Sequence, residues 1–349
     1  MKAKEILKAE NSCKCNYLYV SLSICNLHVM NDSTNLIIDS ANLFLRSWSA
    51  FPSMDANGEP MGGFIGYVKT LQKLIREIKP KQVFIAWEGG GSSKRRSIFS
   101  EYKMNRKPEK LNRYYEGDIP STDDNRQRQT VILIQFLKNL PVHQLYASEC
   151  EADDVISYLC KYALRGQKNI IASSDKDFYQ LVDENTLIYS FHKKKYVSEQ
   201  NIFDEFRITP QNFALAKCLC GDPSDNIPGV KGFGFKTVSK LFPILSSQES
   251  VLVEDLLNYC HTHISDSKLY KRVIDEAELV KQNWRLVFLD GSMLTQQTRL
   301  KIDYTCGTNK PHIDKITLYR LLHDEHISDL DVESVCYDLQ YLARQELND

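Results

Sequence analysis

Acidic residues stand directly after short apolar runs in this chain, and this arrangement constrains its fold more than any other feature. The apolar run at 36–38 is followed by Asp39, and the run at 83–87 is followed by Glu88. Short apolar runs that alternate with helical patterns are typical of buried parallel strands. Because ligands bind outside the carboxyl ends of the strands in an open parallel sheet, these acids are expected to converge on one crevice.

Nine carboxylates fall in five patches of this kind. The segment EADDVISYL carries three of them at its start, and GDPSDNIPG carries two. So many anions in one crevice repel each other strongly at low dielectric unless divalent cations neutralise them. Since Mg²⁺ prefers oxygen ligands, the pattern predicts a site for two or more Mg²⁺ ions, with Mn²⁺ as a substitute. The predicted ligands are Asp39, Glu88, Glu151, Asp153, Asp154, Asp175, Asp177, Asp222 and Asp225.

A plainer interpretation is that each acid only caps a helix, as single acids after strands often do. The spacing favours a shared site instead. Glu151 and Asp154 are three residues apart at the start of a predicted helix, so they can share one face. Asp175 and Asp177 are two residues apart after a strand, where an extended backbone points both the same way. Capping explains any one patch but not five patches in this order.

The alternation of strand and helix patterns predicts an α/β fold with a doubly wound, mainly parallel sheet. Strands are expected at 36–39, 83–87, 142–146 and 169–172, with a hairpin at 187–197, and helices at 62–78, 130–140 and 153–163. From residue 210 the pattern is mainly helical. We expect an N-terminal extension at 1–34, a core at 35–208 with an arch at about 92–128, and a helical region at 209–349.

A basic segment follows the Glu88 turn, although the net charge of the chain is only −1. Residues 94–113 include eight Lys or Arg and two Asp or Glu. A run of charge is usually a solvated helix face. Here its place beside the acids favours phosphate contacts by Lys103 and Arg106 and base stacking by Tyr102.

Three glycines in GVKGFGFK follow a predicted helix at 210–220 and precede another helical pattern. Glycine lets backbone N–H groups approach a phosphate at a helix start, although this spacing alone also fits a plain tight turn. With the preceding GDPSDNIP, the segment predicts a helix–two-turn–helix at about 210–245 that clamps a duplex backbone without reading its sequence. The predicted contact residues are Gly229, Lys231, Gly232, Gly234 and Lys236.

The composition argues against other classes of protein. Ten cysteines lie without a CxxC pair or a zinc spacing, which indicates reduced thiols in a cytoplasmic protein rather than a disulfide framework or a catalytic cysteine. No segment approaches the roughly 20 apolar residues of a membrane span. We therefore expect a protein that does not engage a membrane. We also expect it to be a monomer.

Five motifs together resemble the flap endonuclease and 5′-3′ exonuclease superfamily, which includes phage 5′-exonucleases (also called ribonuclease H) and polymerase-associated 5′ nucleases. The motifs are LIIDSANL, EYKMNR, ECEADDV, ASSDKDF and GDPSDNIPGVKGFG, spread over residues 35–245. The resemblance implies a PIN-like nuclease core under a helical arch, in a phage-encoded or bacterial-type protein that acts at replication sites.

The resemblance also implies residue roles. Asp39, Glu88, Glu151 and Asp153 would bind the first metal ion, and Asp154, Asp175, Asp177, Asp222 and Asp225 would bind or support the second. Lys103 and Arg106 would polarise the scissile phosphate and form the catalytic set with Asp153 and Asp175. Arg95 and Arg96 would contact nucleic acid, Tyr102 would stack on a displaced nucleotide, and K⁺ would bind at the glycine-rich turn. Glu88 departs from the family, which usually has aspartate there.

The expected function is that of a Mg²⁺-dependent, structure-specific 5′ nuclease, which cuts DNA or RNA-primed DNA at 5′ ends and flaps during primer removal. Its partners would be DNA junctions and RNA–DNA hybrids, with a sliding clamp or a single-strand-binding protein as candidate protein partners. One alternative is a catalytically inactive junction-binding protein, which the complete acidic set disfavours. The other is a smaller-substrate phosphohydrolase or single-strand ribonuclease, which the duplex clamp disfavours.

Overall fold

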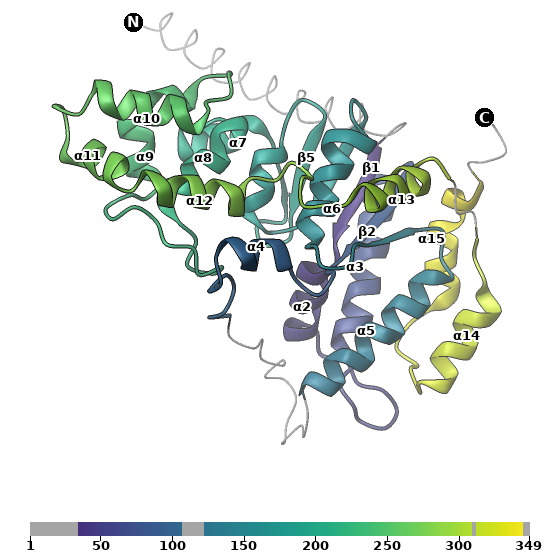
Figure 1. Cartoon of the computed structure of the whole chain (residues 1–349). Coiled ribbons are helices and arrows are strands. Elements are labelled where there is room, and N and C mark those ends of the chain that lie inside the picture. Colours follow the sequence, from purple (N-terminus) through teal and green to yellow (C-terminus); the bar gives the residue numbers. More distant parts are fainter. Residues whose placement is uncertain (1–33, 107–121, 309–311, 345–349) are drawn as a thin grey trace, which may run out of the picture.

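The computed structural model describes residues 34–106, 122–308 and 312–344. Its centre is a six-stranded sheet in the order β3-β2-β1-β4-β5-β6 (Figure 1). The strands are β1 Thr34–Asp39, β2 Gln82–Trp87, β3 His143–Tyr146, β4 Lys168–Ala172, β5 Thr186–Ser190 and β6 Lys195–Val197. Neighbouring strands are parallel except for the antiparallel pair of β5 and β6. The α/β class and the mainly parallel sheet are therefore confirmed.

The sheet is covered on both faces, which explains why β1 is apolar along its length and buried throughout. Leu36 and Ile38 pack into one core cluster, and Ile37 points into the other. The hydrophobic core around Leu36 and Ile38 includes side chains of helices α2 Ser40–Ala50, α3 Gly62–Ile78 and α5 Thr122–Lys138. The hydrophobic core around Ile37 includes side chains of α6 Ala152–Tyr158 and α8 Pro210–Cys220. Strand β1 lies at the centre, where the strand order reverses, so ligands are expected at its carboxyl end.

Two helices differ from the sequence prediction. Helix α5 begins at Thr122 rather than at residue 130, because buried polar contacts replace the apolar period in its first turns. There, Asn125 and Gln129 both donate to the carbonyl of Pro60. The helix expected over 153–163 is α6 followed by a π-helical turn, Leu159–Ala163. Residues 1–33 of the extension expected at 1–34, and residues 107–121 of the expected arch, lie outside the described residues.

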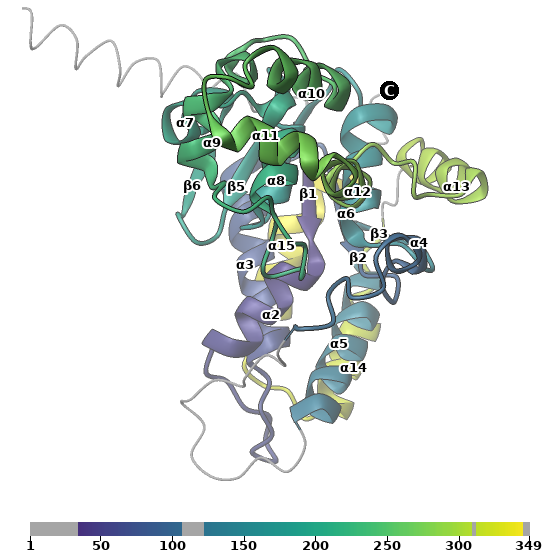
Figure 2. The ribbon, with the colours of Figure 1, turned by 60° about the vertical axis from the view of Figure 1, so that its left-hand side comes forward.

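The helices after β6 form two groups. A lobe beside the sheet contains α7 Glu199–Phe206, α8, α9 Phe235–Leu241, α10 Val253–Thr262, α11 Lys268–Asp275 and α12 Ala277–Val287 (Figure 1). Helix α13 spans Gln296–Cys306, and α14 Lys315–Asp324 and α15 Val332–Arg344 follow it. The last two return to the core and pack against α5 and α3 (Figure 1 and Figure 2). The C-terminal segment therefore contributes to both the lobe and the core.

Two further observations concern membrane spans and cysteines. No helix in the described ranges is long and apolar enough to cross a membrane. The seven cysteines that the structure describes, from Cys150 to Cys336, are all free thiols.

Candidate active site

The carboxyl ends of the strands bring the predicted acids together. Asp39 ends β1, Glu88 follows β2, Asp153 lies in the first turn of α6, and Asp175 follows β4. Their electrostatic neighbours identify one crevice, because Asp153 senses Asp175, Asp39 and Glu151, while Glu88 senses Glu151 and Asp39. We call Asp39, Glu88, Glu151 and Asp153 the first cluster.

Capping and site formation are not alternatives here, because the same acids do both. Asp39 caps α2 by accepting from the Asn42 N–H at 3.1 Å, and Asp175 caps the short 3₁₀ helix Lys176–Leu181 by accepting from the Asp177 N–H at 2.8 Å. The Ser173 hydroxyl donates to Asp39 at 2.8 Å and accepts from the Asp175 N–H at 3.1 Å. Each carboxylate is therefore oriented by its own helix start.

Burial and mutual repulsion make three acids of the first cluster, Asp39, Glu88 and Asp153, reluctant to ionise. Burial raises the pKa of Asp39 to about 6, and the nearby Asp175 adds to the shift. Glu88 is exposed on the crevice wall, yet loss of hydrating water raises its pKa to about 7, and Glu151 and Asp39 raise it further. Burial and the charge of Asp175 also raise the pKa of Asp153. A bound cation would favour the ionised form of each of these groups.

Three further acids, Asp177, Asp222 and Asp225, form the second cluster. Each offers a ligand oxygen, and the three oxygens lie within 4.8 Å of one another. Asp222 is fixed by a turn in which it accepts from the Ser224 N–H at 2.9 Å. Asp175 lies between the clusters, because its charge acts on Asp39 and Asp153 of the first cluster and the charges of Asp225 and Asp222 act on it. Burial raises the pKa of Asp175, whereas the charge of Lys217 opposes that shift.

Lys217 is a site residue that the sequence analysis missed. This lysine of α8 is only 5% exposed, and its ammonium binds Asp177 and Asp222, the latter at 2.8 Å. Burial alone would raise the pKa of Asp222, but the charge and the hydrogen bond of Lys217, together with the hydrogen bonds from Ser224, lower that pKa. The available signal was a single cation in the otherwise apolar helix ALAKCLC, five residues before Asp222.

Lys103 and Arg106 reach the acids as the sequence predicts. The Lys103 ammonium lies 2.7 Å from Glu151 and 3.8 Å from Asp225, so it stands between the two clusters. Arg106 binds Asp225 at 2.6 Å. Lys103 has a left-handed backbone with a φ of 59°, held by its N–H, which donates to the Asp225 carbonyl at 2.9 Å. The chain thus presents both cations at the crevice.

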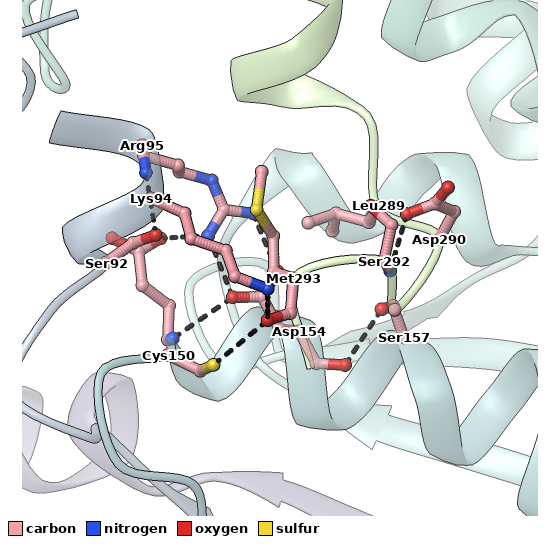
Figure 3. Close-up of polar contacts among 12 residues, drawn as sticks. Ser92, Lys94, Arg95, Cys150, Asp154, Ser157, Leu289, Asp290, Ser292 and Met293 are labelled. Carbon is pink, nitrogen blue, oxygen red and sulfur yellow. Dashed lines mark hydrogen bonds and ion pairs between the residues drawn. The ribbon is translucent and has the colours of Figure 1, made fainter. Parts of the chain in front are cut away.

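Three predicted roles are corrected by burial. Arg95 is 1% exposed and binds both oxygens of Asp154 at 2.8 Å, so it has no face free for a phosphate (Figure 3). Asp154 is also 1% exposed, and the Arg95 guanidinium binds both of its carboxylate oxygens. Tyr102 is 4% exposed and donates to Glu151 at 3.0 Å, so its ring cannot stack on a base in this conformation.

The remaining predicted contact residues lie at the surface. Arg96 is exposed on α4 Ser93–Ile98, the helix that carries Arg95. In the glycine-rich turn Lys231, Gly232, Gly234 and Lys236 are exposed, and Gly232 needs its φ of 95°. Gly229 packs against the end of α8, where an added Cβ would lie 2.2 Å from the Cys220 carbonyl oxygen. Its glycine is therefore required by close backbone packing.

The donor set fits divalent cations that prefer oxygen. Eight carboxylates face one crevice, three of them within ligand spacing, and burial raises the pKa of several others. Asp39, Glu88, Glu151 and Asp153 would hold one ion. Asp177, Asp222 and Asp225 would hold another, with Asp175 between them.

An α/β core that gathers acidic side chains, together with Lys103 and Arg106, at the carboxyl ends of its strands defines a nuclease-type site. The family model described as 5′-3′ exonuclease, N-terminal resolvase-like domain, matches residues 34–207. A 5′-3′ exonuclease of Buchnera aphidicola subsp. Acyrthosiphon pisum is 33% identical over 230 residues, which is 64% of this chain and 74% of that protein. The 5′-3′ exonuclease of Aquifex aeolicus is 29% identical over 221 residues, which is 63% of this chain and 72% of that protein.

A solved structure shares the fold. It is a bacteriophage T5 flap endonuclease in a pseudo-enzyme-product complex with DNA and metal ions, with a TM-score of 0.59 at 18% identity, covering 89% of this chain and 100% of that chain. The chain described here belongs to the 5′-3′ exonuclease family. It is a nuclease, that is, a phosphodiester hydrolase.

Proposed function

We propose that the protein is a divalent-metal-dependent, structure-specific 5′ nuclease that cuts DNA or RNA-primed DNA at 5′ ends and flaps, and that it removes primers during replication. The observation that carries this proposal is the placement of Lys103 between two acidic clusters. Mg²⁺ is the proposed cofactor, with Mn²⁺ as a substitute. The T5 flap endonuclease that shares the fold was solved with DNA and metal ions, which supports both the DNA substrate and the divalent cofactor of this proposal.

The chemistry follows from the side chains around the crevice. When bound, divalent cations would supply an acidified water and charge neutralisation. The two clusters would each hold one ion and orient the phosphodiester between them. Lys103 and Arg106 would neutralise charge that develops on the phosphate, in a site where burial strengthens such contacts. Tyr102 orients Glu151 through its hydroxyl instead of stacking on a base.

The duplex would be held outside the crevice. The exposed Lys231 and Lys236 flank the glycine-rich turn at the start of α9, where they would contact backbone phosphates without reading sequence. K⁺ at this turn and phosphate contact by Arg96 belong to the same proposal. So do RNA–DNA hybrids as substrates, a monomeric cytoplasmic enzyme, and a sliding clamp or single-strand-binding protein as partner.

The test is cleavage of a labelled 5′-flap duplex with Mg²⁺ by the wild type, Asp175→Ala and Asp39→Asn. We expect the wild type to cut and both variants to lose at least about 100-fold in rate, more than the loss of an outer-shell partner typically costs. Asn caps a helix as well as Asp does, so Asp39→Asn removes charge while it keeps the cap of α2. Asp204→Asn on the exposed face of α7 is the matched control and should cut normally.

A junction-binding protein without catalysis is the competing function. Equal persistence of the flap substrate with the wild type and Asp175→Ala, together with tight junction binding by both, would establish it in place of the nuclease.

A further inference from the structure

We propose that Arg95 and Asp154 form a positioning pair, which fixes Glu151 and the Lys103 segment and ties both to helix α12. The inference deepens the proposed nuclease function and rests on it for its catalytic readout. It assigns to Arg95 a place behind the site rather than on the substrate.

The Arg95 guanidinium and the Asp154 carboxylate bind each other inside the protein (Figure 3). Arg95 Nη1 donates to Asp154 Oδ2 and Arg95 Nη2 to Asp154 Oδ1, both at 2.8 Å, in a bidentate fork. The remaining Arg95 Nε donates to the Leu286 carbonyl of α12 at 3.0 Å. Since both side chains are 1% exposed, neither is available to solvent or substrate.

The pair acts on Glu151 from the protein side. Arg95 Nη1 lies 3.3 Å from Glu151 Oε2, and the Tyr102 hydroxyl donates to that same oxygen at 3.0 Å. Asp154 Oδ2 accepts from the Glu151 N–H at 3.1 Å, which fixes the backbone as well. The other oxygen, Oε1, is left to face the Lys103 ammonium at 2.7 Å. One oxygen of Glu151 is thus anchored and the other is presented to the crevice.

The segment 286–293 fastens this arrangement to the C-terminal half of the chain. Its carbonyls accept from Arg95 at Leu286, from Lys161 at Leu289 at 2.5 Å, and from Lys94 at Met293 at 2.7 Å. Figure 3 shows the contact between Lys94 and Met293. Arg95 and Lys94 both belong to α4, just before the segment that carries Tyr102 and Lys103. Residues beyond the matched 34–207 therefore help to set the catalytic geometry.

A buried ion pair is a weak source of stability, because the cost of desolvating both charges offsets their attraction. Its geometric effect can therefore be separated from its effect on folding. Removing one partner leaves a buried charge and destabilises the fold, whereas neutralising both does not. The informative variant is Arg95→Met with Asp154→Asn, since asparagine keeps an acceptor for the Glu151 N–H.

The first measurement needs no DNA. We expect the double variant to melt close to the wild type but to bind Mg²⁺ about 10–100-fold more weakly by calorimetry, as loss of outer-shell support does at other metal sites. On a 5′-flap duplex we expect kcat to fall by a similar factor while KM stays within about threefold. Arg95→Lys keeps the positive charge but loses the bidentate contact, so its Mg²⁺ affinity and its kcat should lie between those of the wild type and the double variant.

The control is Arg207→Met with Asp204→Asn, an ion pair between exposed side chains of the α7 region, which should leave all three readouts unchanged. A double variant with wild-type Mg²⁺ affinity and kcat would overturn the proposal. A loss confined to KM would show instead that Arg95 contacts the substrate. Should the double variant not fold, Arg95→Lys decides alone. Weaker Mg²⁺ binding by this variant would support the proposal, and wild-type Mg²⁺ binding would overturn it. If the wild type cuts no DNA, the nuclease proposal fails while the Mg²⁺ comparison still judges the pair.

Discussion

The two acidic clusters of the crevice use the same residue types but differ in what neutralises them. In the first cluster, burial and repulsion raise the pKa of Asp39 to about 6 and that of Glu88 to about 7. In the second, Lys217 binds Asp177 and Asp222, and the pKa of Asp222 is lowered although it is partly buried. Lys217, a buried lysine of the preceding helix α8, therefore helps to keep the Asp222 carboxylate ionised.

The two clusters are therefore expected to differ in how strongly they bind a divalent cation. The first cluster has no arginine or lysine of the described chain on Asp39 or Asp153 within 4.0 Å, so a divalent ion would relieve the largest repulsion there. The second carries its own countercharge. A divalent ion bound there must share Asp177 and Asp222 with Lys217 or displace its ammonium, which should weaken binding at that cluster.

The largest effect is expected from removing the cation that reaches both clusters. Lys103→Ala should lower kcat by about 10²–10³-fold, as loss of a group that stabilises transition-state charge does elsewhere, while DNA affinity changes little. Single-turnover cleavage and DNA binding at fixed salt measure the two separately. Lys73→Ala on the exposed side of α3 is the control. A change in affinity alone would mean that Lys103 only holds the substrate.

The pKa difference predicts a pH-dependent metal requirement. Below pH 7 protons compete for Glu88 and then for Asp39, so the half-saturating Mg²⁺ concentration should rise about tenfold or more between pH 8 and pH 6. In Glu88→Gln this dependence should be shallower, whereas Glu205→Gln, outside the crevice, should retain it. An equally steep dependence in Glu88→Gln would place the titration on other groups.

The same shifts act on the metal-free fold with a defined sign. Because the raised pKa values let the folded chain bind protons more tightly than the unfolded chain, these acids stabilise the fold most below their unfolded values near pH 4. That contribution is lost as the pH rises through about 6 and 7. Melting in a chelator should accordingly show a lower Tm at pH 8 than at pH 6.

The smallest effect concerns the countercharge of the second cluster. Lys217→Met leaves Asp177 and Asp222 uncompensated, so the variant should melt lower without Mg²⁺ and gain a few degrees more than the wild type when Mg²⁺ is added, since roughly 1 kcal/mol corresponds to about 2–4 °C in domains somewhat smaller than this chain. Lys315→Met is the control, because that lysine lies at the surface and binds Glu333 rather than these acids. Equal Mg²⁺ responses of the two variants would remove Lys217 from the metal site.

The sequence by itself determined the sheet and most of the crevice. Apolar runs are local signals, and a parallel sheet carries the residues after them to one edge, so the order of residues is enough to group Asp39, Glu88 and Asp175. The motif EYKMNR likewise located Lys103 and Arg106. The sequence did not show that α5 begins eight residues early, because its first turns are held by polar contacts that follow no apolar period.

Only the tertiary structure decided which neighbouring side chains face the crevice. Asp153 and Asp154 are adjacent in sequence, but successive helical residues point about 100° apart, so one meets the other acids and the other meets Arg95. Lys217 lies in a helix that looks like plain core, and Arg95 in a run that looks like a solvated surface. Their roles depend on partners 40 and 59 residues away along the chain. Local pattern fixes where strands end, whereas the neutralisation of a buried charge is settled by the segments that pack around it.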